Sequence, residues 1–148
     1  MARRAATRAN PAAHRLKTIR DHIRQESTQD IDGLLAGMTK DCSTIVMCAP
    51  RPYIGPKAVE RRYREQWTGF PDFKVRIRRI IAMGPKYAVT ENEWTGTHLG
   101  PFMGREPTGK RVRVRTAVIW EFRGDKLRGE YIYFDLATVL RQMGALPR

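Results

Sequence analysis

The chain is organised around a segment that reads ENEWTGTHLGPFMGREPTG at residues 91–109. It begins with the pattern of a β-strand, and a run rich in glycine and proline then interrupts that pattern until the next strand begins at Lys110. Glycine and proline concentrated between two strands are typical of a shaped loop. The segment also contains Trp94 and His98. We therefore expect it to form the rim of a pocket, with His98 near the mouth.

Length and composition indicate one globular domain. A chain of 148 residues buries about 70% of its unfolded surface, and 41% hydrophobic and 29% charged residues are ordinary values for such a domain. There is no apolar run of transmembrane length and no apolar stretch of the kind a secretory signal needs. Cys42 and Cys48 would lie about 20 Å apart along one strand, which is too far for a disulfide. We predict a cytoplasmic protein with reduced thiols, no membrane contact and no metal site.

The formal net charge is +13, and six basic residues precede the first acidic residue, Asp21. Residues 1–12 are small and basic and lack a helical period, so we predict a flexible basic tail there and a single domain over residues 13–148. The composition favours a solvated tail over a contact with nucleic acid or another polyanion, although it leaves both open.

Helical spacing is found in three segments of the first half of the chain. The first covers residues 12–25. Ser27 and Thr28 then offer an N-cap for a second helix that extends to Met38. After a short β-type run at residues 41–49, the Gly55-Pro56 pair predicts the start of a third helix that ends near Trp67. The inward positions are Leu16, Ile19, Ile23, Ile31, Leu34, Leu35, Met38, Val59, Tyr63 and Trp67.

From residue 73 the apolar period changes from 3.6 to 2. It predicts strands over residues 73–83, 87–98, 110–123 and 127–135, the last two joined by a hairpin turn at residues 124–126. A short helix at residues 136–143 follows. A curved sheet wrapped around helices buries one face of each, so we predict an α+β fold in which a cone of curved antiparallel sheet packs on three N-terminal helices.

The same alternation predicts which side chains share a face. Asn92, Trp94 and His98 share one face of their strand, and Tyr131, Tyr133 and Asp135 share one face of theirs. Ile119, Ile132 and Phe134 are placed opposite the main core. Apolar side chains on that outer face suggest that a second copy of the chain covers it, which predicts a homodimer.

Two residues are candidates for proton transfer. Asp135 follows a strand with two tyrosines on its face, a setting that could raise the pKa of its carboxyl, but it could equally cap the helix that starts at Leu136. His98 could relay a proton or hold a carbonyl oxygen, or it could be a loop histidine bonded to the backbone. The candidate substrate-binding residues are Trp94, Trp120, Tyr131, Tyr63 and Asn92, although aromatic side chains at strand spacing are often plain core.

Other functional signals are missing from the sequence. There is no phosphate-binding glycine loop, no nucleophile elbow and no metal-ligand spacing. The basic side chains at residues 110–115 lack the interleaved aromatic residues that single-stranded nucleic acid would need, so a solvated or inter-subunit face is favoured.

Several motifs together resemble a known family. They are WTGTHLGPF at residues 94–102, PTGK at 107–110, YFD at 133–135 and RQMGALP at 141–147, with YIG at 53–55 and FPDF at 70–73 upstream. In this order they resemble the SnoaL-like polyketide (ester) cyclase family of the nuclear-transport-factor-like, cystatin-like superfamily. The likeness covers residues 14–147.

The resemblance implies a cone that encloses an apolar pocket, commonly in a homodimer, and an intramolecular aldol closure that uses neither cofactor nor metal. It also implies that Asp135 acts as acid and base and that His98 assists. Our leading hypothesis is therefore an acid–base enzyme of cyclase or isomerase type acting on a small hydrophobic carbonyl compound. The alternatives are a non-catalytic small-molecule-binding module of the same fold and a basic protein that contacts a polyanion.

Overall fold

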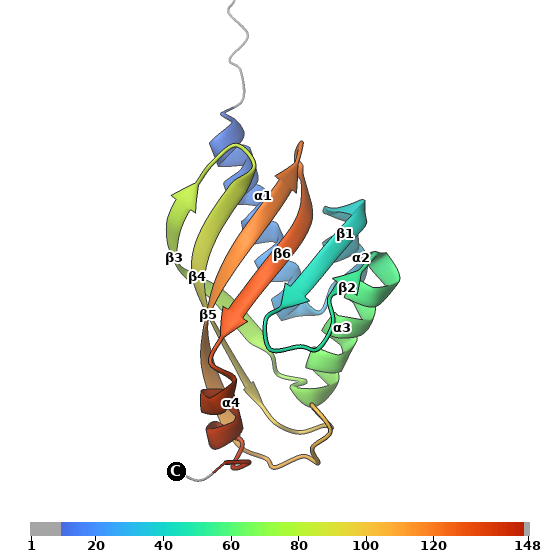
Figure 1. Ribbon diagram of the computed structural model, residues 1–148, viewed down its shortest axis with the longest axis vertical. Coiled ribbons are helices and arrows are strands. Elements are labelled where there is room, and N and C mark those ends of the chain that lie inside the picture. Colours follow the sequence, from blue (N-terminus) through green and yellow to red (C-terminus); the bar gives the residue numbers. More distant parts are fainter. Residues whose placement is uncertain (1–9, 147–148) are drawn as a thin grey trace, which may run out of the picture.

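The computed structural model describes residues 10–146, which form an α+β domain (Figure 1). The helices are α1 (Pro11–Thr28), α2 (Ile31–Ala36), α3 (Pro56–Gly69) and α4 (Leu136–Gln142). The strands are β1 (Met38–Val46), β2 (Tyr53–Ile54), β3 (Lys74–Met83), β4 (Tyr87–Thr97), β5 (Arg111–Arg123) and β6 (Lys126–Phe134). In the described part of the chain, no helix is long and apolar enough to cross a membrane.

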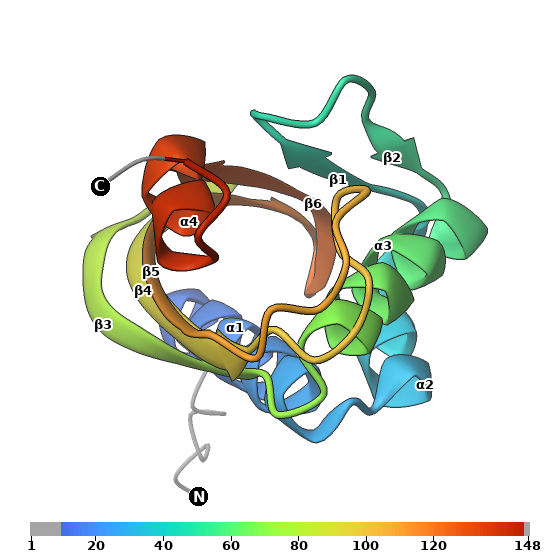
Figure 2. The same cartoon turned by 90° about the horizontal axis from the view of Figure 1, so that it is seen from below.

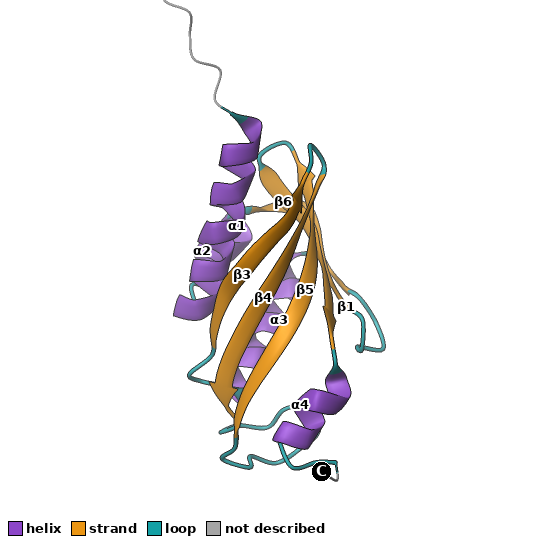
Figure 3. Cartoon of the chain, turned by 90° about the vertical axis from the view of Figure 1, so that its left-hand side faces the viewer, coloured by secondary structure: helices purple, strands orange, loops and turns teal. Residues whose placement is uncertain are grey.

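The six strands form one curved sheet in the order β2-β1-β6-β5-β4-β3. Neighbouring strands are antiparallel except β1 and β6, which run parallel. The sheet curls around an interior that α1 and α3 close from the other side, and α4 lies at one end (Figure 2). Seen from the side, α1, α2 and α3 all lie on the concave side of the sheet (Figure 3). The predicted fold class is confirmed.

Capping residues decide where the first two helices begin and end. The Asn10 side chain accepts a hydrogen bond from the N–H of Ala12, so α1 begins inside the segment predicted as tail; residues 1–9 of that prediction lie outside the described residues. The predicted N-cap at Ser27 and Thr28 was wrong. Both residues belong to α1, and Asp30 caps α2 by accepting from the N–H of Gly33.

A bulge in β6 determines which of its side chains face the interior. Leu127 lies opposite Phe122, but Gly129, not Arg128, lies opposite Glu121, so Arg128 is an extra residue. In a regular strand, residues 129, 131 and 133 would face the same side as Leu127. Because of the extra residue, residues 130, 132 and 134 face that side instead.

The placement of Ile132 and Phe134 on the outer face was therefore wrong. They lie opposite Val118 and Thr116, on the core face, while Tyr131 and Tyr133 point outward.

Glycines allow the 98–109 loop to lie against the end of α3. The N–H groups of Leu99 and Gly100 both donate to the carbonyl oxygen of Gly69, at 3.0 and 3.2 Å. A β-carbon at Gly96 would lie 2.9 Å from that of Phe70, and one at Gly100 would overlap the carbonyl oxygen of Thr68. The predicted loop is thus fastened to a helix end by close backbone contacts.

Replacing Gly100 with alanine should therefore destabilise the protein, because the atom that the new methyl group meets belongs to the backbone and cannot move aside. We expect the free energy of unfolding in urea to fall by about 2–3 kcal/mol. Gly37→Ala is the control, since its β-carbon would be 3.5 Å from the nearest atom; it should change stability by less than about 1 kcal/mol. Equal effects of the two substitutions would contradict the overlap.

Candidate functional site

A pocket of about 950 Å³ opens between α3, the segment that follows β1, and the 98–109 loop. These elements surround one end of the cone in Figure 2. Its wall combines apolar side chains with a row of charged residues from α3. The apolar and aromatic lining residues are Val46, Ala49, Pro50, Tyr53, Pro101, Phe102, Met103 and Phe134. The charged ones are Lys57, Glu60, Arg61, Arg62, Arg64 and Glu65.

Ion pairs along α3 neutralise part of this charged row. Glu60 accepts a hydrogen bond from Arg64 at 2.7 Å, and Glu65 lies 3.9 Å from Arg61. Both carboxylates of the pocket wall thus have an arginine partner. Among residues 10–146, neither Lys57 nor Arg62 has an acidic group within ion-pair distance, so the wall keeps a net positive charge.

Arg62 stands between the pocket and the interior of the cone. Its guanidinium carbon lies 4.5 Å from the centre of the Tyr63 ring, in a cation–π arrangement. Its Nη1 atom is buried, with no hydrogen-bond partner in the described chain. The Tyr63 ring, which is itself fully buried, therefore separates the pocket cation from what lies behind it.

Behind Tyr63 lies a buried polar network in which three side chains converge on Oε1 of Glu130. The Tyr63 hydroxyl donates to this oxygen at 2.7 Å, the Thr44 hydroxyl donates at 3.3 Å, and Nε2 of His22 lies 3.3 Å away. Nε2 of His22 is also 2.9 Å from the Tyr63 oxygen and 3.5 Å from Oε1 of Glu26. Elements α1, α3, β1 and β6 thus meet at one cluster.

Burial and mutual attraction set the protonation of this cluster. Burial raises the pKa of Glu26 to about 7, against an ordinary value of 4.5. Burial also acts to raise the pKa of Glu130, but the charge and hydrogen bond of His22 outweigh it and lower that pKa. Burial acts to lower the pKa of His22, yet Glu130 and Glu26 together raise it. Near neutral pH the cluster is therefore a His22–Glu130 ion pair beside a carboxyl that gains and loses its proton.

The same cluster offers ligand atoms for a metal ion. One atom each from His22, Glu26 and Glu130 lie within 4.8 Å of one another, and all three side chains are buried. Imidazole and carboxylate groups are common ligands for divalent cations. Tyr63 and Thr44 already satisfy Glu130 by hydrogen bonds, so the cluster also stands as a polar network without an ion.

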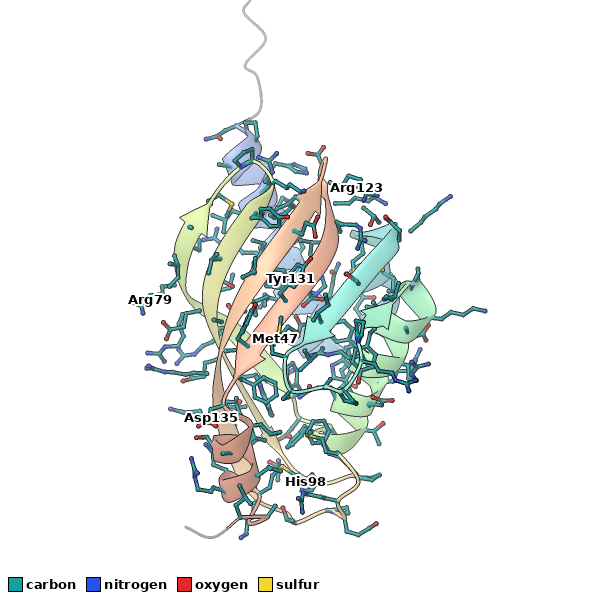
Figure 4. The ribbon with its side chains drawn as sticks, viewed as in Figure 1. Met47, Arg79, His98, Arg123, Tyr131 and Asp135 are labelled. Carbon is teal, nitrogen blue, oxygen red and sulfur yellow. The ribbon has the colours of Figure 1, made fainter. Side chains whose placement is uncertain are left out.

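Asp135 lies on the surface, at the start of α4 (Figure 4). Its side chain accepts hydrogen bonds from the N–H of Ala137 and the hydroxyl of Thr138. The bond from Thr138 is the main reason that the pKa of Asp135 is lowered. These contacts are those of the helix cap that we weighed as the alternative; its predicted role in proton transfer stays a prediction.

His98 is buried in the 98–109 loop rather than open to the pocket. Its Nδ1 accepts from the backbone N–H of Thr108 at 3.3 Å and lies 3.0 Å from that residue's hydroxyl oxygen, while Nε2 is buried without a partner among the described residues. Burial lowers its pKa. The ring packs against Phe70, at 5.5 Å between centres. The alternative of a loop histidine bonded to the backbone fits this position, and its catalytic role stays a prediction.

The structure separates the candidate substrate-binding residues. Trp94 packs against Phe70 and Phe73 in the core, and Trp120 donates to the hydroxyl of Thr90 at 2.8 Å and stacks edge-on to His22. Asn92 is buried, and its Oδ1 lacks a partner in residues 10–146. Tyr63 belongs to the network, and Tyr131 lies on the outer face, where its hydroxyl donates to Glu121 at 3.1 Å. None of the seven predicted site residues lines the pocket.

Sequence reasoning missed four residues of this site: His22, Glu26, Arg62 and Glu130. A signal existed for the first two, because they share helical spacing with Ile19 and Ile23 on the apolar face of α1. Glu130 faces inward only because of the bulge at Arg128. Arg62 is one of several neighbouring arginines on α3, and their spacing does not show that it differs from the others.

Solved structures of several proteins share this fold. A SnoaL-like polyketide cyclase candidate from Jannaschia sp. CCS1 superposes with a TM-score of 0.84 at 20% identity, over 97% of this chain and 100% of that one. IdmH, a polyketide cyclase candidate from Streptomyces antibioticus, gives 0.75 at 20% identity, over 88% and 98%. TerC, co-crystallised with polyporic acid, gives 0.72 at 14% identity, over 88% and 98%. These likenesses define a protein of the α+β cone class.

The sequence comparison identifies the family within that class. The family model described as SnoaL-like polyketide cyclase matches residues 16–143. The chain therefore belongs to the SnoaL-like polyketide cyclase family, as its motifs had predicted. No curated protein matches the chain.

The raised pKa of Glu26 predicts a pH dependence of stability. Between pH 4.5 and pH 7 the folded state holds a proton that the unfolded state releases, so stability is greatest at the acidic end and falls as pH rises through 7. The loss should be about 3 kcal/mol. Glu26→Gln, which is neutral at every pH, should flatten this decline and exceed the wild type at pH 8, as urea unfolding at several pH values would reveal.

The exposed residue Glu106 provides the control, since Glu106→Gln removes a carboxylate outside the network. The stability of this variant should depend on pH as that of the wild type does. A wild-type stability that rises from pH 5 to pH 8, or a Glu26→Gln profile as steep as that of the wild type, would contradict the assignment.

Proposed function

We propose that this protein is an acid–base enzyme of cyclase or isomerase type that acts on a small hydrophobic carbonyl compound. The observation that carries the proposal is the position of the His22–Glu26–Glu130 network, one tyrosine ring behind the wall of an apolar pocket. Membership of the SnoaL-like polyketide cyclase family supports it. So does the co-crystallisation of TerC, which has the same fold, with an organic molecule.

The network has the parts that enolate formation needs. A base must remove the proton next to a carbonyl group, and hydrogen-bond donors must stabilise the charge that develops on the oxygen. In our proposal Glu130 takes the proton as the carbon–hydrogen bond breaks. Tyr63 and protonated His22 donate to the enolate oxygen, and Glu26 restores protons close to neutral pH.

Access to the network depends on Arg62. Its guanidinium covers the Tyr63 ring from the pocket side, and within residues 10–146 no acidic side chain forms an ion pair with it. In our proposal a ligand in the pocket reaches the network when the Arg62 side chain and the Tyr63 ring behind it both move aside. In this proposal Asp135 serves as a helix cap, and His98 positions the loop that forms one pocket wall.

Deuterium exchange tests this chemistry without knowledge of the natural substrate. A panel of aryl methyl ketones and hydrophobic β-keto esters is incubated with the protein in D₂O, and loss of the α-proton is followed by NMR. Glu130→Gln should slow exchange by about 100-fold, because it removes the base. Asp135→Asn should stay within about threefold of the wild type, since it keeps a capping side chain outside the network.

Tyr63→Phe deletes one hydroxyl donor of the network and keeps the ring, so its exchange rate reports the contribution of that hydroxyl. Circular dichroism establishes that each variant is folded. Exchange lost in Asp135→Asn but kept in Glu130→Gln would reverse the assignment and restore Asp135 as the acid–base group.

A non-catalytic binding module is the second candidate function, favoured by the burial of the network: His22, Glu26 and Glu130 are 2%, 7% and 1% exposed. Such a module would bind the ketones without accelerating exchange over buffer. The same experiment therefore separates the two candidates.

We also propose that two copies pair through the outer sheet face. Met47, Tyr87 and Tyr133 are 44%, 45% and 42% exposed there, and Tyr131 and Ile119 lie among them. Figure 4 shows Met47 and Tyr131 on this face. Apolar surface of this kind favours self-association.

Substituting a charge into this face tests the dimer. Tyr133→Lys should convert a dimer to a monomer in sedimentation experiments, because it places a charge in the buried contact. Ile54→Lys, at an exposed position on β2, should leave the sedimenting species a dimer. A wild-type monomer at high concentration would sink this part of the proposal.

A further inference from the structure

The pocket wall holds one half-buried cation that no acidic side chain of the described chain contacts as an ion pair. Arg61 and Arg64 are paired with Glu65 and Glu60, and their side chains are 65% and 58% exposed. Arg62, the residue between them, is half-buried and has no such partner in residues 10–146. Only Lys57, which is exposed, shares this lack of a partner on the wall. Of the two cations on the wall that lack an ion-pair partner, Arg62 is therefore the more buried.

An unpaired guanidinium in this position is costly in the free protein. Its Nη1 atom is buried and forms no hydrogen bond with described residues, and a buried donor without an acceptor is unfavourable, more so when it is charged. Arginine cannot relieve this cost by losing its proton. The cation–π contact with Tyr63 and the charges of Glu130 and Glu26 stabilise the cation, but none of these groups accepts a hydrogen bond from Nη1. An anionic acceptor supplied by a ligand would provide what the chain does not.

The surroundings of Arg62 select the kind of anion. A guanidinium presents a planar pair of N–H donors that matches a carboxylate in bidentate geometry. A phosphate binds best to several free donors, whereas the other arginines of the wall, Arg61 and Arg64, are already paired with Glu65 and Glu60. The lining also includes Val46, Phe102 and Phe134, which offer apolar contact only. One negative charge on a hydrophobic body fits this wall.

We propose that the pocket binds a hydrophobic molecule that bears a single carboxylate, which forms a bidentate ion pair with Arg62. The inference uses the pocket of the proposed function and names the chemical class of its ligand. The body of the ligand lies along Phe102 and Phe134.

Direct binding of matched probes tests the proposal without a turnover assay. The probes are 2-naphthoate, its neutral amide 2-naphthamide and 2-naphthyl phosphate, titrated by calorimetry at low salt. The wild type should bind 2-naphthoate more tightly than either of the other two. Arg62→Met should weaken 2-naphthoate about 10- to 100-fold and leave 2-naphthamide within twofold, because it removes the charge but keeps an apolar side chain of similar length.

The control is Arg79→Met, which removes the same charge from β3, where Arg79 pairs with Glu91 at 2.7 Å and is 69% exposed. It should bind 2-naphthoate like the wild type. Circular dichroism and a thermal melt establish that both variants are folded, and Arg62→Lys should recover only part of the affinity because lysine lacks the planar fork.

Three results would overturn the inference: equal affinity for 2-naphthoate and 2-naphthamide, tighter binding of 2-naphthyl phosphate, or an Arg62→Met variant that binds 2-naphthoate unchanged. Failure of the proposed function is distinguishable from failure of this inference. If the protein binds 2-naphthoate through Arg62 but never accelerates the exchange of ketone protons, the proposed function fails and the carboxylate inference stands.

Discussion

The hydrogen bond from Tyr63 to Glu130 is the interaction on which the interior of this protein depends. Oε1 of Glu130 also receives Thr44 and faces His22, so one carboxylate oxygen ties together four elements that are far apart in the sequence. A buried carboxylate is stable only when such partners are in place, since its desolvation costs several kcal/mol. The packing of α1 and α3 onto the sheet and the chemistry of the network are therefore set by the same contacts.

The pocket and the network are complementary in charge. The pocket wall carries an excess of positive charge, while the network behind it contains two carboxylates and one imidazole. Arg62 acts on both, because its charge acts to lower the pKa of Glu26 and of Glu130 from the pocket side. Any change in the position of this arginine therefore alters proton affinity in the interior. In the proposed complex, ligand binding and protonation are therefore linked through one side chain.

The sequence was sufficient for the architecture but not for the site. The change of apolar period at residue 73 and the Gly55-Pro56 pair placed the sheet and α3, since both reflect local backbone preferences. The residues on the inner face of β6 could not be predicted, because nothing in its sequence reveals that Arg128 is an extra residue. Asp135 could be either a base or a cap, and only its surroundings separate these roles. The environment of Arg62 depends on packing between elements, which spacing along one helix does not encode.

The bulge at Arg128 decides which residues of β6 face the interior. If the chain kept its length but the bulge closed, Arg128 would lie opposite Glu121 and the two faces of the strand beyond it would be exchanged. Glu130 would then face solvent, and Tyr131 and Tyr133 would line the interior. A shift of register by one residue could thus turn an ionisable cavity into an aromatic one without any amino-acid replacement. The position of one bulge, as much as the identity of the residues, therefore decides which side chains this cone presents to its interior.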